Sequence, residues 1–273
     1  MSPGRHPRRT RAPISRPFAA PVGGWILACH DSVSRRTALA VLPLPPAELQ
    51  QQFFGREVPF EAFLETGRRC AGALERALAA QSLTMAGFHR VLDFGCGCAR
   101  VLRHFAPLFE GREFHGTDAD TATIQWNRAH IPGVTFHQHA AEPPFPFTER
   151  EFDCVWSITA FSRLSEASAV RWLYHLQQVL RPGGIALISV HGLFRFSEDV
   201  ARGCIRPEAA RQFDTRGFTF VDAAGDPRLP DWYQHAFMTE DFARGLFCEH
   251  FDVLDYLARG IMDREDLLVL RRR

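Results

Sequence analysis

The sequence contains no lysine, so all 32 of its basic residues are arginine. A Schiff-base lysine, a pyridoxal-phosphate enzyme and a Walker-type phosphate loop each depend on an ammonium group, and the sequence therefore excludes these chemistries. It also lacks an apolar run of the roughly 20 residues that a membrane span needs. The longest run, residues 185–190, has the length of a buried strand. We therefore expect no membrane-spanning segment.

Cysteine is present without a disulfide or zinc pattern. The seven cysteines are an odd number and have no framework spacing, which favours reduced, buried thiols and a cytoplasmic location. Cys96 and Cys98 form the only close pair, and no further Cys or His stands at zinc-ligand spacing from them. The sequence predicts no metal site.

The charges nearly balance over the 273 residues, with 31 acids against 32 arginines and 46% hydrophobic residues. This composition is typical of a globular protein with a sizeable core. Five of the arginines precede the first acid, Asp31, so the rest of the chain has an excess of acids. Nucleic-acid-binding domains usually show the opposite sign. A nucleic-acid partner is therefore not expected, and a small-molecule partner is favoured.

The first 45 residues differ from the rest. Residues 1–22 are rich in Pro and Arg. An acid-free start resembles a transit peptide, but its prolines oppose an amphipathic helix, so a flexible tail or a misassigned start is preferred. Residues 25–44 could form a short strand pair. We predict a poorly ordered extension and linker over 1–45, followed by one domain over 46–273 with an N-terminal helical cap at 46–86.

Short apolar runs and amphipathic segments alternate from residue 90 onward. The predicted strands are 90–94, 113–117, 134–138, 152–158, 185–190, 251–257 and 266–271, and the predicted helices are 99–109, 120–130, 166–180 and 240–248. Strands that alternate with helices form parallel sheets covered on both faces. The sequence therefore predicts an α/β fold, a doubly wound, mostly parallel seven-stranded sheet whose last two strands form an antiparallel edge hairpin.

The segment 193–235 breaks this alternation. It contains seven aromatic residues among several charges, so we expect an ordered but irregular insertion. Ligands of open α/β sheets bind outside the carboxyl ends of the strands. We therefore expect residues 48–80 and 193–235 to fold over this rim and to bind the second substrate.

The residues after the first predicted strand carry the clearest chemical signal. Asp93 ends the strand, and Gly95 and Gly97 allow a tight bend that a ligand can approach closely. A nicotinamide fingerprint, G-x-G-x-x-G, would need a third glycine where Arg100 stands. An acid at this point would also repel a pyrophosphate, whereas it would attract a sulfonium or ammonium cation.

This segment, Val91-Leu92-Asp93-Phe94-Gly95-Cys96-Gly97-Cys98-Ala99, resembles motif I of the class I S-adenosylmethionine-dependent methyltransferases, roughly V-L-D-x-G-x-G-x-G. Three further blocks resemble the family in the same order along the chain. They are 114–120 at the second strand, 143–157 with its P-P-F-P-F and F-D-C-V sequences, and the L-R-P-G-G turn at 180–184. The resemblance covers residues 87–191.

The resemblance implies a Rossmann-like methyltransferase fold and S-adenosylmethionine as the cofactor. It places Asp118 where the family has the acid that accepts hydrogen bonds from both ribose hydroxyls. The residues it assigns to cofactor binding are Asp93, Gly95, Gly97, Ala99, Asp118, Ala119, His139, Ala140 and Thr159.

The sequence departs from the family pattern at a few positions. Ala99 replaces the third glycine of motif I, which removes freedom to adopt positive φ, and Arg163 stands where one branch often has His. His139 and Ala140 occupy the place of an acid or amide near the adenine. These departures leave open a catalytically degenerate cofactor-binding protein, and a nicotinamide-dependent reductase is a further, less favoured alternative.

Methyl transfer from a sulfonium mainly needs alignment and desolvation. A general base is required only when the nucleophile must lose a proton. If there is one, His191 at the end of the fifth strand and His235 in the insertion are the catalytic candidates, because histidine titrates near neutral pH. The sequence does not distinguish methylation of oxygen, nitrogen or carbon.

Overall fold

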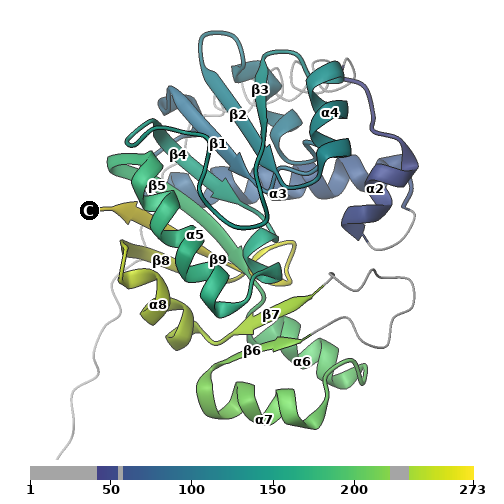
Figure 1. Ribbon diagram of the computed structural model, residues 1–273, viewed down its shortest axis with the longest axis vertical. Helices are drawn as coiled ribbons and strands as arrows, with labels where there is room; N and C mark the ends of the chain where they lie inside the picture. Colours follow the sequence, from purple (N-terminus) through teal and green to yellow (C-terminus); the bar gives the residue numbers. More distant parts are fainter. Residues whose placement is uncertain (1–41, 55–57, 222–233) are drawn as a thin grey trace, which may run out of the picture.

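The computed structural model describes residues 42–54, 58–221 and 234–273. The predicted leader and the predicted strand pair up to residue 41 lie outside these ranges. The main sheet contains β1 (Arg90–Phe94), β2 (Glu113–Asp118), β3 (Val134–Gln138), β4 (Phe152–Ser157), β5 (Leu180–Val190), β8 (Phe251–Ile261) and β9 (Glu265–Arg272). Its strand order is β3-β2-β1-β4-β5-β9-β8 (Figure 1).

The topology confirms the predicted sheet. Strands β1 to β5 pair in parallel, and β9 is antiparallel to both β5 and β8, so the last two strands form the expected edge hairpin. The strand order reverses between β1 and β4. This switch point opens at the carboxyl ends of the two strands, where open α/β sheets bind their ligands.

Helices cover both faces of the sheet. They are α2 (Ala47–Phe54), α3 (Phe60–Ala80), α4 (Thr121–His130), α5 (Glu166–Val179) and α8 (Glu240–Cys248), with the 3-10 helices η1 (Met85–Gly87), η2 (Leu102–Leu108) and η3 (Ala160–Arg163). One core cluster joins α3, η2 and α4 to Val91 and Trp156, and the other joins α5 and α8 to Leu92 and Val155. Neighbouring strand residues thus point into opposite layers, as the two-residue period of a strand requires.

Local features differ from the prediction at two places. The segment expected to be a helix over 99–109 forms turns and then the 3-10 helix η2, whose Pro107 lacks the N–H of an α-helical bond. The L-R-P-G-G segment bulges out of β5, because Phe152 pairs with Leu180 whereas Cys154 already pairs with Ile185.

The predicted helical cap consists of two helices with different roles. Helix α3 buries Phe63 and Leu74 and packs on the sheet face, so it is a layer of the core rather than a cover over the rim. Pro59 is its N-cap residue. Helix α2 contacts the glycine loop, because the Leu49 carbonyl accepts a hydrogen bond from the Cys98 thiol at 3.4 Å.

The described part of the insertion is regular, contrary to the expectation of irregular structure. It comprises α6 (Leu193–Ala201), α7 (Pro207–Arg216) and a two-stranded sheet of β6 (Phe218–Val221) and β7 (His235–Met238). Phe196, Phe213 and Phe237 form a small core of their own. In Figure 1 these elements lie together at one end of the molecule, beyond the main sheet.

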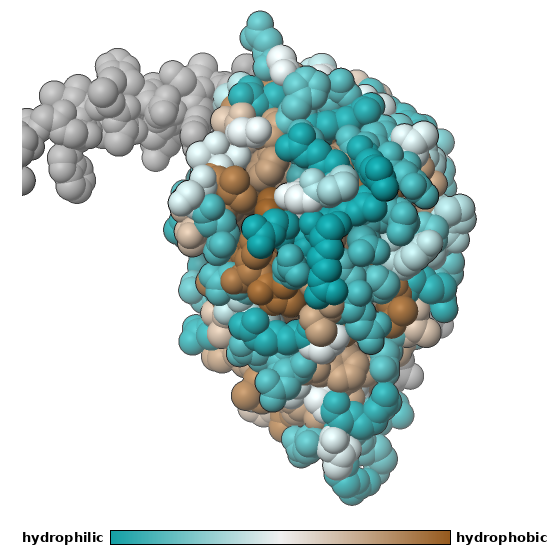
Figure 2. All heavy atoms as spheres, turned by 90° about the vertical axis from the view of Figure 1, so that its left-hand side faces the viewer, coloured by the Kyte–Doolittle hydropathy of each residue, from teal (hydrophilic) through white to brown (hydrophobic). Residues whose placement is uncertain are grey.

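The surface is mainly polar on the face shown in Figure 2, where hydrophilic side chains surround a smaller group of hydrophobic ones. Within the described residues, no helix is both long and apolar enough to cross a bilayer. The same residues contain no disulfide, because the six cysteines among them are free, and no cluster of His, Cys, Asp and Glu that could hold a metal ion.

Candidate active site

The loop after β1 bends sharply beside the end of β2. The backbone N–H groups of Gly95 and Cys96 both donate to the Thr117 carbonyl, at 2.8 and 2.9 Å. Gly95 has φ +73°, and a Cβ added to it would lie 2.7 Å from the Cβ of Ala160. The loop therefore approaches the segment after β4 so closely that only glycine fits at position 95.

Ala99 corrects one expectation from the sequence. Its replacement of glycine was expected to remove positive φ, yet Ala99 adopts φ +54° in the left-handed region. This conformation costs an L-residue about 1–2 kcal/mol. Ala99 is fully buried, so the surrounding packing maintains the bend that glycine would otherwise supply.

Asp118, the last residue of β2, holds the glycine loop in place. One carboxylate oxygen accepts a hydrogen bond from the backbone N–H of Gly97 at 2.9 Å, and the other accepts one from the N–H of Asp120 at 3.0 Å. From the other side, the Asn127 side chain donates to the Gly97 carbonyl at 2.6 Å. Burial raises the pKa of Asp118. Ala119, the next residue, is exposed.

Asp93 is a buried acid at the end of β1, only 3% exposed. Burial raises its pKa to about 8, against the opposing effects of the Trp156 indole and the Arg100 guanidinium, while Asp118 adds to the rise. None of the described residues forms an ion pair with Asp93. A carboxyl group in such surroundings gains most from a bound cation, because the cation restores the charged form that burial disfavours.

His139 lies next to Asp118, beyond the end of β3. Its backbone N–H donates to the Asp118 carbonyl at 3.2 Å, and its ring stacks on Phe94 with centroids 5.5 Å apart. Phe145 and Trp172 also contact the ring. The exposed residue Ala140 accepts a hydrogen bond from the ring through its carbonyl at 2.6 Å. The structure thus brings His139 and Asp118 together beside an aromatic cluster.

Thr159 lies between the glycine loop and a second group of polar residues, Ser189, Glu265 and His191. It has φ +71° just after β4. Its backbone N–H donates to the Ser189 hydroxyl at 2.7 Å, and its own hydroxyl donates to Glu265 at 3.0 Å. Glu265 lies in turn 3.7 Å from Nε2 of His191. Sequence reasoning missed Ser189 and Glu265, which no local motif indicates.

The two catalytic candidates lie together. The rings of His191 and His235 stack with centroids 5.4 Å apart. The guanidinium of Arg163 lies 3.2 Å from both ring nitrogens of His235. Burial, followed by the charge of Arg163, lowers the pKa of His235 to about 2. Burial also lowers the pKa of His191, against the opposing effect of Glu265. Both imidazoles are therefore neutral near pH 7.

Comparison with known proteins gives a family match over the same region. The model of the methyltransferase domain family matches residues 91–184, which include the glycine loop, Asp118 and the bulge of β5. Over this region, about a third of its length, the chain has a methyltransferase domain of the class I S-adenosylmethionine-dependent type. It is a methyltransferase enzyme, and S-adenosylmethionine is its cofactor.

Particular relatives agree with this assignment. The methyltransferase is 28% identical over 155 residues to an uncharacterized methyltransferase of Synechocystis sp., an alignment that spans 52% of this chain and 72% of that protein. It is 32% identical over 146 residues to a malonyl-[acyl-carrier protein] O-methyltransferase of Enterobacter lignolyticus, spanning 52% of this chain but only 54% of that protein.

A solved structure extends the likeness of the fold to most of the chain. The 1,6-didemethyltoxoflavin-N1-methyltransferase of Burkholderia thailandensis, solved with 1,6-didemethyltoxoflavin and S-adenosylhomocysteine, has a TM-score of 0.52 at 16% identity. The alignment covers 96% of this chain and 94% of that protein.

The buried polar atoms of this methyltransferase fit the cofactor. At the carboxyl ends of β2 and β4, the hydroxyls of Thr117 and Ser157 and the indole N–H of Trp156 are buried without hydrogen-bond partners. Trp156 lies opposite Asp93 in the register of β1 and β4, and Asp93 forms no ion pair with any described residue. A nucleoside with a cationic side chain would supply both polar partners and a positive charge.

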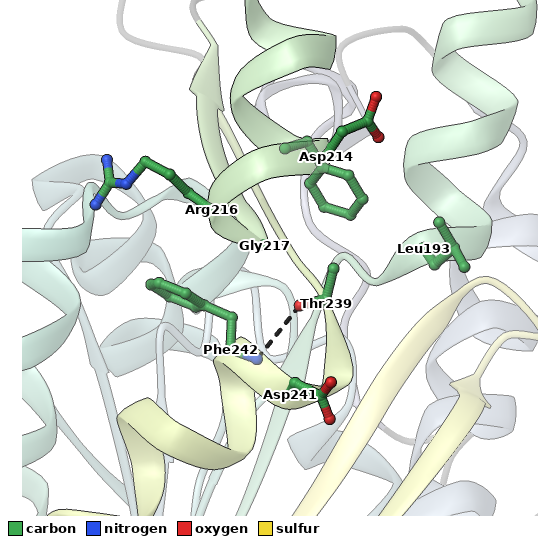
Figure 3. A pocket seen from close by; sticks show the side chains of 8 residues that line it. Leu193, Asp214, Arg216, Gly217, Thr239, Asp241 and Phe242 are labelled. Carbon is green, nitrogen blue, oxygen red and sulfur yellow. Dashed lines mark hydrogen bonds between the residues drawn. The ribbon is translucent and has the colours of Figure 1, made fainter.

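A separate hollow of about 610 Å³ lies between the insertion and the start of α8. Figure 3 shows Asp214, Arg216 and Gly217 at the end of α7 facing Thr239, Asp241 and Phe242 at the start of α8, with Leu193 of α6 at the side. No residue of the glycine loop lines this hollow, so the hollow is separate from that loop.

Proposed function

We propose that this methyltransferase transfers a methyl group to an oxygen, nitrogen or carbon nucleophile of a small-molecule acceptor. The observation that carries the proposal is the arrangement at the switch point of the sheet. There an acid-clamped glycine loop on one side and the stacked pair of buried His191 and half-buried His235 on the other are linked through the segment after β4, which contains Thr159 and Ala160. The first side is suited to a cationic nucleoside, and the second to an acceptor.

On the cofactor side, we assign Asp93, Gly95, Gly97, Ala99 and Asp118 to the loop and its flanking acids, and Ala119, His139, Ala140 and Thr159 to the adjoining rim. Asp118 is already oriented by the N–H groups of Gly97 and Asp120. A carboxylate fixed in this way can accept hydrogen bonds from vicinal hydroxyls without further loss of side-chain freedom.

On the acceptor side, we assign His191 and His235 as the residues that face the nucleophile. The insertion supports this assignment because β7 carries His235 and reaches the end of β5, where the Met238 N–H donates to the His191 carbonyl at 2.9 Å. The insertion thus forms the wall of the acceptor site. A small-molecule acceptor fits such an enclosed position, and the excess of acids beyond residue 31 disfavours a nucleic acid.

The chemistry needs few groups. The positive sulfur of the bound cofactor activates the methyl group, so the protein has to align the nucleophile with the carbon–sulfur axis and to exclude water. Buried aromatic residues of the core layer that contains α5 and α8 lie beside the site, among them Phe94 and Phe161. Their apolar surfaces keep water away from the reacting atoms.

Calorimetry with purified protein tests the proposal. We expect binding of S-adenosylmethionine and S-adenosylhomocysteine but not of NADH. Asp118→Asn should weaken this binding by about 10- to 100-fold, since a hydrogen bond to a charged group contributes about 1.5–3 kcal/mol. Glu113→Gln is the matched control, because Glu113 is an exposed acid at the opposite end of the same strand. Equal affinities of the two variants would contradict the assignment of Asp118.

A further inference from the structure

The register between β5 and β9 places the carboxylate of Glu265 beside His191. Strand β9 pairs with β5 so that Ser189 lies opposite Leu267 and Val190 opposite Asp266. Continued by one residue, this antiparallel register places position 265 beside position 191. The apolar residues 267–270 are fully buried. The register is therefore fixed by the core rather than by the polar groups themselves.

Both oxygens of the Glu265 carboxylate are held by hydroxyl groups. Thr159 donates to one oxygen at 3.0 Å and Ser189 donates to the other at 2.7 Å. Burial alone would raise the pKa of Glu265, but its interactions with His191 and these two hydroxyls lower it to about 2. Glu265 is therefore a fully charged carboxylate in a fixed orientation.

The position of this carboxylate determines where the His191 proton lies. Nε2 is the ring nitrogen that faces Glu265, at 3.7 Å. A charged carboxylate only accepts hydrogen bonds, so the neutral ring carries its proton on Nε2 and leaves Nδ1 as a bare acceptor. Nδ1 is buried and has no hydrogen-bond partner among the described residues. An unpaired acceptor in the interior is costly unless a ligand satisfies it.

The groups around His191 come from several elements. They are Glu265 on β9, Arg163 on η3, Arg195 and Asp199 on α6, and the His235 ring on β7. Arg195 pairs with Asp199 at 2.9 Å. Glu265 is the acid that lies within ion-pair distance of the His191 ring.

Resting on the proposed function, we infer that Glu265 is a positioning residue that fixes His191 as a base with Nδ1 toward the acceptor. The acceptor is accordingly a protic nucleophile, namely a hydroxyl, an enol or a ring N–H. An acceptor with a free lone pair and no proton to lose, such as a thioether or a tertiary amine, would need no such pair.

The step balances without a further reactant. A lone pair of the acceptor forms the bond to the methyl carbon while the carbon–sulfur bond breaks, and its electron pair stays on sulfur. The acceptor proton passes to Nδ1 of His191 and leaves to solvent after the products depart. The Glu265 carboxylate stabilises the imidazolium that exists between these events.

Nitrogen NMR of the histidine rings tests the inference without knowledge of the acceptor. His191→Asn assigns the His191 signals. We expect His191 of the parent protein to carry its proton on Nε2, and its pKa to fall in Glu265→Gln because the opposing charge is lost. Glu265→Asp keeps the charge and should retain most of the effect. Glu208→Gln is the matched control, since Glu208 is an exposed acid on α7 that pairs with Arg211 at 3.1 Å, and it should leave the His191 signals unchanged.

An Nδ1-protonated His191 in the parent, or a titration unaffected by Glu265→Gln, would overturn the inference. If Glu265→Gln does not fold, Glu265→Asp provides the test, because it keeps the charge but moves it away from His191. An unchanged His191 titration in this variant and an Nδ1 proton in the parent would then overturn the inference. Binding of S-adenosylhomocysteine, measured on the same samples, tests the proposed function separately. If the parent protein does not bind it, the proposed function fails whatever the tautomer of His191.

Transfer of a deuterated methyl group to a panel of phenols, enols and ring N–H compounds, against thioethers and tertiary amines, supplies a second readout. Turnover with the protic compounds should fall at least about 100-fold in Glu265→Gln, by much more than the affinity for S-adenosylhomocysteine falls. Equal turnover of thioethers by the parent and by this variant would refute the assignment of the acceptor class.

Discussion

Binding of the cofactor to the buried acid Asp93 should release a proton. Burial raises the pKa of Asp93 to about 8, so at pH 7 about nine tenths of the free protein carries a protonated Asp93. A bound cation beside this carboxyl group favours its charged form and lowers the pKa again. Binding of S-adenosylmethionine at pH 7 should therefore release close to one proton, and the release should disappear above about pH 9.

Calorimetry in two buffers measures this release directly. A proton taken up by Tris contributes much more heat than one taken up by phosphate, so the difference between the observed binding enthalpies gives the number of protons. Asp93→Asn should bind more weakly and release none. Glu113→Gln, an exposed acid on the neighbouring strand, should release as many protons as the parent.

The reasoning would be refuted if the parent showed the same binding enthalpy in both buffers at pH 7. That result would mean that Asp93 is already ionised in the free protein, or that it does not sense the bound cation. A proton release that persists in Asp93→Asn would instead point to a different titrating group.

Two further predictions concern stability. Gly95→Ala should lower the free energy of unfolding by about 2–5 kcal/mol, because the new Cβ adds a clash with Ala160 to the cost of positive φ. Gly111→Ala, at φ +80° with nothing within 4 Å, should cost only about 1–2 kcal/mol; equal losses in chemical denaturation would argue against the loop contact. Burial lowers the pKa of His104 and of His115 to about 4. As the pH falls below about 6.5, these two histidines therefore take up protons in the unfolded chain but not in the folded protein, and the free energy of unfolding decreases. His104→Gln and His115→Gln should each reduce the loss measured between pH 7 and 5 by about 1–2 kcal/mol, and losses equal to that of the parent would contradict these shifts.

The elements that build the sheet could be predicted from the sequence because their signals are local. Strands 90–94 and 134–138 have the predicted bounds, since the first is a short apolar run that ends at Gly95 and the second begins directly after Gly133. Ser165 directly precedes the predicted helix 166–180, and its hydroxyl accepts a hydrogen bond from the Ser168 N–H as an N-cap. The position of Asp118 at the end of β2 follows from the same alternation of strand and helix.

The remainder depends on contacts that no local pattern encodes. Helix α7 buries only Phe213, so its sequence has no apolar stripe and indicates a loop. The positive φ of Ala99 results from packing around a fully buried residue and contradicts the intrinsic preference of alanine. Glu265 stands 106 residues after Thr159, and its carboxylate accepts a hydrogen bond from the Thr159 hydroxyl. Such a pair becomes visible only once the strand order is known.

The edge hairpin therefore contributes to the site as well as to the sheet. Because side chains alternate along a strand, a register shift of one residue between β5 and β9 would turn Glu265 to the opposite face and bring Asp266 toward His191. Asp266 instead accepts hydrogen bonds from the Tyr256 hydroxyl and the Arg259 N–H, so the two neighbouring acids have separate partners. The apolar residues 267–270 fix this register, and the orientation of the polar network at the active site follows from the packing of the core.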